Sequence, residues 1–171
     1  MLPIQILLNN LLYDISEIAI PFDQDDEEAI AGPVKRDVKF IGRFMLVFGP
    51  LSSVFDFLTF YVLLYLFSAG EALFQTGWFI ESITTQVLVV FAIRTRRPIF
   101  RSRPHVFLAA MALGVVAVAI ALPLLPVGRW LGFVAPPPLF FVFLIGATLA
   151  YLAIVEIAKR IFYRAISVAK R

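Results

Sequence analysis

The sequence contains no cysteine among its 171 residues, which excludes disulfides, thiol nucleophiles and cysteine metal ligands. It has a single histidine, and its 9 glycines form no phosphate-binding loop. No nucleophile stands beside a base in a known catalytic motif. We therefore assign no catalytic residue, and we expect no nucleotide hydrolysis by this chain alone.

Apolar residues, in contrast, are abundant. Hydrophobic residues make up 61% of the chain, including 18 phenylalanines, and the mean hydropathy is +0.91. An average soluble domain is about 45–50% apolar. This excess, together with only 16% charged residues, indicates a membrane protein.

Five stretches are apolar and long enough to cross a bilayer as helices, which takes about 17–25 residues each. Turn residues and charges separate them, most clearly in an acidic and then basic loop at residues 22–43. We predict an all-α, polytopic membrane bundle that forms one transmembrane domain over residues 1–171. The predicted spans are residues 4–21, 44–67, 74–93, 106–125 and 139–157.

The basic residues are distributed unevenly between the predicted connections. All but one of the 15 lysines and arginines lie in the first connection, the third connection or the tail, and the exception is Arg129. Because basic flanks stay in the cytoplasm, we expect the N-terminus outside and the C-terminus inside. The net charge of +3 therefore reports the topology of the chain in its lipid bilayer, and we expect no nucleic-acid partner.

Polar side chains interrupt the first predicted span. Asn10, Asp14 and Glu17 are spaced i, i+4 and i+7, so they share one helix face. A carboxylate at mid-bilayer costs about 2.5 kcal/mol or more, so such groups face a cavity, a partner or an ion. Their oxygens suit a hard cation; the alternative is hydrogen bonding to neighbouring helices. Asn10 and Asp14 are the main candidates for a cation pathway, and Glu17, nearer the interface, is weaker.

Two further carboxylates lie in later spans. Asp56 shares a face with Ser52, and it either lines a pathway or acts as an interhelical hydrogen-bonding or protonated acid. Glu81 shares a face with Thr85 and could contribute to a binding cavity. The alternative interpretations of Glu81 are packing between helices and a position near the outer interface. Both residues are weaker pathway candidates.

The first span starts almost at Met1, although its polar face needs other helices to shield it. We therefore expect the chain to be the C-terminal part of a longer protein whose earlier helices provide that shield. On this interpretation, Asp14 should lack hydrogen-bond partners within the chain.

Three stretches carry a specific resemblance: LPIQILLNNLLYDISEIAIPFD, VKFIGRFMLVFGPLSSVFDFLTFYVL, and FQTGWFIESITTQVLVV followed by IRTRRPIF. They strongly resemble the C-terminal membrane region of bacterial magnesium-transporting P-type ATPases, and the similarity covers nearly the whole chain. It implies the sixth to tenth membrane helices of such a pump. In the sixth helix of this family an Asn-x-x-x-Asp element helps to form the transport site, and Asn10 and Asp14 match it. An acidic residue on the eighth helix can contribute, and Glu81 is the candidate.

The resemblance also implies the setting of the chain. The family imports Mg²⁺ across the bacterial inner membrane at the expense of ATP, through an aspartyl-phosphate. The phosphorylation motif, the nucleotide-binding domain and the first five membrane helices are not in this sequence, so ATP would act only in the full-length pump. The remainder of the pump is then the expected protein partner. The alternative function is a truncated or stand-alone membrane scaffold without transport activity.

Overall fold

The computed structural model describes residues 1–23, 38–95 and 104–169. Within these ranges every regular element is helical, which confirms the predicted all-α fold. The five long helices are α1 (Pro3–Glu17), α3 (Val38–Tyr61), α4 (Glu71–Ile93), α5 (Val106–Ala121) and α7 (Pro138–Ala169). The short elements are η1 (Ile20–Phe22), η2 (Val62–Leu66), η4 (Leu122–Leu124) and α6 (Pro126–Trp130).

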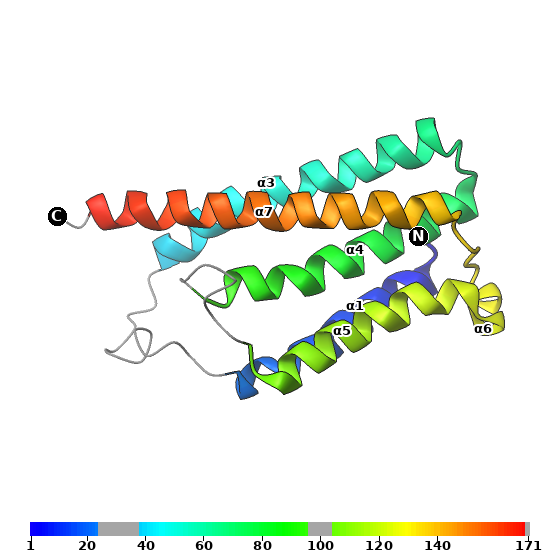
Figure 1. The fold of residues 1–171 in the computed structure, drawn as a ribbon, viewed down its shortest axis with the longest axis horizontal. Helices are drawn as coiled ribbons and strands as arrows, with labels where there is room; N and C mark the ends of the chain where they lie inside the picture. Colours follow the sequence, from blue (N-terminus) through cyan, green and yellow to red (C-terminus); the bar gives the residue numbers. More distant parts are fainter. Residues whose placement is uncertain (24–37, 96–103, 170–171) are drawn as a thin grey trace.

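Helix α4 forms the centre of an elongated bundle, as Figure 1 shows. It packs against α1 and α5 on one side and against α3 and α7 on the other. In the most apolar 18-residue stretch of α4, 61% is buried, against 28–33% of the corresponding stretches in the other three helices that could cross a membrane. The other helices therefore form a layer around α4 and present apolar surface outward.

Local sequence explains how α1 begins and ends. Pro3 occupies the first helical position, where its missing N–H costs nothing. The Gln5 side chain accepts a hydrogen bond from the Leu2 N–H at 3.0 Å, so one free donor of the first turn is paired. After Glu17 the chain passes into the 3₁₀ turn η1, which contains Pro21. The chain direction thus changes just after the polar part of α1.

Four helices within the described residues are long and apolar enough to cross a membrane. They cover Gly42–Leu66, Glu71–Ile93, Val106–Leu124 and Pro138–Arg164, which overlap the last four predicted spans. Helix α1 has 15 residues, about 22 Å at 1.5 Å per residue, which is shorter than a hydrocarbon core of about 30 Å. Its role as a fifth span stays a prediction.

Two apolar clusters hold the bundle together. The larger joins α1, α4, α5 and the start of α7, with Phe79, Ile83 and Phe140 fully buried. The smaller joins α3, α4 and α7 around Phe55 and Tyr151, whose ring centroids are 5.1 Å apart. Because α4 contributes to both clusters, its two sides face different sets of helices.

The last helix also holds the end of α4 by a polar contact. Lys159 of α7 is buried, and its Nζ donates a hydrogen bond to the Ala92 carbonyl oxygen at 2.8 Å. The same ammonium lies 2.7 Å from Glu156 Oε2. Lys159 lies beyond residue 157, where the sequence-based prediction ends the last span, and the helix itself continues to Ala169.

Candidate functional site

Helix α1 buries a polar stripe that differs from the predicted one. Its buried residues are Gln5, Asn9, Leu12 and Ser16, at the i, i+4, i+7 and i+11 spacing of one helix face. Gln5 Nε2 donates to the Leu131 carbonyl oxygen at 3.1 Å, and Ser16 Oγ donates to the Tyr13 carbonyl oxygen at 2.6 Å. Asn9 Oδ1 is buried without a hydrogen-bond partner among the described residues. This stripe faces α4 and α5.

Asn10 and Asp14 lie outside this stripe, on an exposed face of α1. Among the residues that the structure describes, neither side chain forms a hydrogen bond or an ion pair. Exposed Leu7, Leu11 and Ile18 surround them. Two adjacent turns of a largely apolar face therefore carry an amide and a carboxylate whose oxygens are available to a ligand.

Glu17 lies at the edge of that face, one turn beyond the pair. It is half-buried and stands beside the phenol hydroxyl of Tyr13. Its carboxylate is therefore less free to meet a ligand than that of Asp14.

The two later carboxylates lie on the same side of α4, where α3 and α7 pack. Glu81 is only 1% exposed, and its Oε2 has no hydrogen-bond partner in the described part of the chain. Asp56 accepts a hydrogen bond from Trp78 Nε1 at 3.4 Å. Tyr151 of α7 lies within electrostatic range of both carboxyl groups. The structure thus brings Asp56 and Glu81 together.

These two carboxylates are separated from Asn10 and Asp14 by the body of α4. The side of α4 that meets Leu12 of α1 consists of apolar residues such as Ile83 and Val87. Glu81 shares a face with Ala92, at i+11, and Ala92 packs on α3 and α7. The structure therefore does not place Glu81 beside the α1 pair, and the described residues contain no group of three or more acidic, histidine or cysteine side chains that could hold a metal ion.

Sequence reasoning missed Asn9, Gln5 and Ser16 as inward-facing polar residues. The helical spacing that groups Asn10 with Asp14 groups these three equally well. Both faces of α1 also carry leucines, so helical spacing alone could not tell which of the two polar stripes is buried.

An all-helical bundle with four helices that can cross a membrane, and with carboxylates and amides inside its helices, defines a polytopic membrane protein with polar intramembrane residues. The family model described as "Cation transporting ATPase, C-terminus" matches residues 1–161. The chain belongs to this family, whose region is the C-terminal membrane part of cation-transporting ATPases.

Curated relatives agree with this assignment. The chain is 42% identical over 169 residues to "Magnesium-transporting ATPase, P-type 1" of Salmonella typhimurium (strain LT2), and 40% identical to the protein of the same name from Escherichia coli (strain K12). Each alignment covers 96% of this chain and 19% of the relative. The chain thus spans about a fifth of the length of the curated relatives that it matches.

Proposed function

We propose that this chain forms the C-terminal membrane bundle of a P-type pump that imports Mg²⁺ across the bacterial inner membrane, and that Asn10 and Asp14 line its cation pathway. The names of the relatives, at about 40% identity over 96% of the chain, support the ion. The basic connections support an orientation with the C-terminus in the cytoplasm. The remaining helices and the cytoplasmic domains of the pump are the partners in this proposal.

The observation that carries the proposal is the exposed, unpartnered state of Asn10 and Asp14 on α1. A polar group without a partner is costly in lipid, so this face suits contact with other helices of the pump and with a partly hydrated ion. Mg²⁺ commonly retains several waters and binds through one or two carboxylates. One carboxylate and one amide on consecutive turns match that requirement.

The other candidates take secondary roles in this proposal. Glu17 stands toward the cytoplasmic end of the same face, where it could guide the ion. Asp56 and Glu81 lie across α4 from the pair and would act on the pathway only indirectly, by holding α3, α4 and α7 in place. ATP hydrolysis belongs to the remainder of the pump in this proposal, because the chain contains no nucleotide-binding motif.

The test is Asp14→Asn in the full-length pump, reconstituted in proteoliposomes. Because Mg²⁺ also accompanies ATP, free Mg²⁺ is titrated on the transport side while Mg-ATP is held constant on the other side. Loss of a charged ligand, worth about 1.5–3 kcal/mol, should lower the apparent Mg²⁺ affinity about 10- to 100-fold. Uptake and ATP hydrolysis are measured together.

The matched control is Glu71→Gln, which removes an exposed carboxylate at the far end of α4 whose partner is the local Gln75. It should leave uptake unchanged. If Asp14→Asn and Asn10→Ala both retained normal affinity and turnover, the pathway assignment would be wrong, and a scaffold role for this bundle would be favoured.

A further inference from the structure

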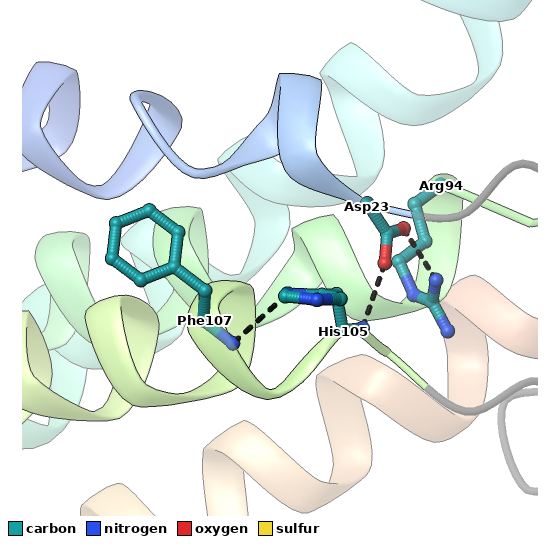
Figure 2. A network of polar contacts seen from close by, with 4 residues as sticks. All are labelled: Asp23, Arg94, His105 and Phe107. Carbon is teal, nitrogen blue, oxygen red and sulfur yellow. Dashed lines mark hydrogen bonds and ion pairs between the residues drawn. The ribbon is translucent and has the colours of Figure 1, made fainter.

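A single carboxylate joins three elements at the end of the bundle opposite the N-terminus. Asp23, just after η1, forms an ion pair through Oδ2 with Nη1 of Arg94 at the end of α4. Its Oδ1 accepts a hydrogen bond from the backbone N–H of His105, at 2.9 Å, immediately before α5. Figure 2 shows Asp23 between these two partners. The carboxylate therefore connects the end of the α1 segment to α4 and α5 at once.

The partners of Asp23 are themselves held in place. His105 Nδ1 accepts a hydrogen bond from the Phe107 N–H at 3.2 Å, which caps the first turn of α5. The Phe107 ring packs edge-on against Phe22, with centroids 5.2 Å apart. A carboxylate near this helix N-terminus also interacts favourably with the helix dipole. The junction thus combines one ion pair, two hydrogen bonds and one aromatic contact.

Burial makes the ion pair sensitive to substitution. The side chains of Asp23 and Arg94 are 12% and 8% exposed. When one partner of a buried ion pair is removed, the other keeps a charge that is poorly solvated. Loss of either side chain would therefore weaken the connection between the helix ends attached to them.

Asp23 lies only a few residues beyond the end of α1 at Glu17. The intervening turn η1 is short and contains Pro21, whose fixed backbone angle limits the freedom of this connection. A helix of this length moves as a rigid body, so a shift at its end is transmitted to Asp14. The position of α1 against α4 and α5 thus depends on this junction.

We propose that Asp23 is a positioning residue for the cation pathway: its contacts with Arg94 and the His105 N–H fix α1 against α4 and α5 and thereby set the position of Asn10 and Asp14. The inference rests on the proposed function of that pair. It adds a role for a residue at the start of the 22–43 connection and for the first arginine of the basic cluster after α4.

The first test measures transport by the full-length pump with Asp23→Asn, Asp23→Ala, Arg94→Gln and Arg94→Lys. Asp23→Asn retains an acceptor for His105 but loses the charge, whereas Asp23→Ala loses both contacts. Mg²⁺ demands near-ideal coordination geometry, so we expect apparent Mg²⁺ affinity to fall several-fold in Asp23→Asn and Arg94→Gln and further in Asp23→Ala. Maximal turnover should change less than twofold, and Arg94→Lys should restore most of the affinity.

The second test follows the junction without using transport. The chain has no cysteine, so Phe22→Cys and Phe107→Cys can be introduced in a cysteine-free full-length pump and joined by a short bifunctional thiol reagent. Asp23→Asn should slow this cross-linking, because the two segments are no longer held together. Glu71→Gln, at the other end of α4, should not slow it.

The outcomes separate the two proposals. If Asp14→Asn lowers the Mg²⁺ affinity but neither Asp23 variant does, the positioning role is overturned while the proposed function stands. Slower cross-linking with unchanged affinity overturns the link between the junction and the pathway. A loss of turnover at unchanged affinity would also overturn it, since it would reveal a purely structural role. If Asp14→Asn has no effect, the proposed function fails whatever the Asp23 variants do.

Discussion

Two regions of this bundle are built from similar side chains and differ in where those side chains point. Asn10 and Asp14 on α1 are exposed and unpartnered among the described residues, whereas Glu81 and Asp56 lie on the side of α4 where α3 and α7 pack. In both regions a carboxylate lies within an otherwise apolar helix. Spacing along a helix tells which side chains share a face, but only the neighbouring helices decide whether that face is buried. The exposed pair is the one that we propose for the cation pathway.

The largest difference between the two regions is expected when one carboxylate is added to each of them. Thr85→Asp would place it in the buried region next to Glu81, and Asn10→Asp would place it beside Asp14. An unpaired buried charge costs about 3–5 kcal/mol, so we expect Thr85→Asp to abolish the folded, monodisperse full-length pump. Asn10→Asp should be produced at a normal level. Size-exclusion chromatography in detergent compares the yields.

Equal yields of these two variants would show that the region around Glu81 is accessible to water, and the distinction between the regions would be lost. Thr85→Val serves as the control for shape. It removes a hydroxyl that donates to the Glu81 carbonyl oxygen at 3.0 Å, and it adds no charge.

A smaller effect on stability is expected at two glycines, one in the centre of the bundle and one on its outer surface. A Cβ added at Gly77 of α4 would lie 2.7 Å from Leu63 Cδ2, whereas at Gly146 of α7 it would meet nothing within 4 Å. Replacement of a helical glycine by alanine favours the helix by about 1 kcal/mol, and overpacking costs about 1–3 kcal/mol. Gly146→Ala should therefore raise the thermal midpoint and Gly77→Ala should not. Thermal unfolding in detergent measures both midpoints. An equal rise in the two midpoints would show that the Leu63 side chain can move aside without loss of stability.

The general architecture could be predicted from the sequence because membrane-spanning helices are long and uniformly apolar. The four helices that can cross a membrane coincide with predicted spans within a few residues at most ends. The exception is the last helix, which continues to Ala169. The prediction ended this span at residue 157 because charges follow, and it could not know that Lys159 is buried against the Ala92 carbonyl oxygen.

The candidate site could be predicted only in part, since the sequence contains no information about which face meets which helix. Asn9 and Asn10 are adjacent and chemically identical, yet one is buried and the other exposed. Glu81 was a weaker pathway candidate with packing between helices as an alternative, and in the structure it lies on the opposite side of α4 from Asp14. The junction at Asp23 was invisible because its partner Arg94 is 71 positions away in the sequence.

The smallest expected changes in stability are at two positions of α1, where one substitution should affect folding and the other Mg²⁺ affinity. Ser16 is buried and donates to the Tyr13 carbonyl oxygen, so Ser16→Ala should cost about 0.5–1.5 kcal/mol and leave the apparent Mg²⁺ affinity of the full-length pump unchanged. Asp14→Leu removes no hydrogen bond or ion pair of the described residues, so the thermal midpoint should fall no further than in Ser16→Ala, yet the variant should abolish high-affinity uptake. Thermal midpoints and uptake are measured on the same preparations. If Asp14→Leu destabilised the pump more than Ser16→Ala, Asp14 would be a packing residue, and the contrast between its exposed face and the buried stripe would fail.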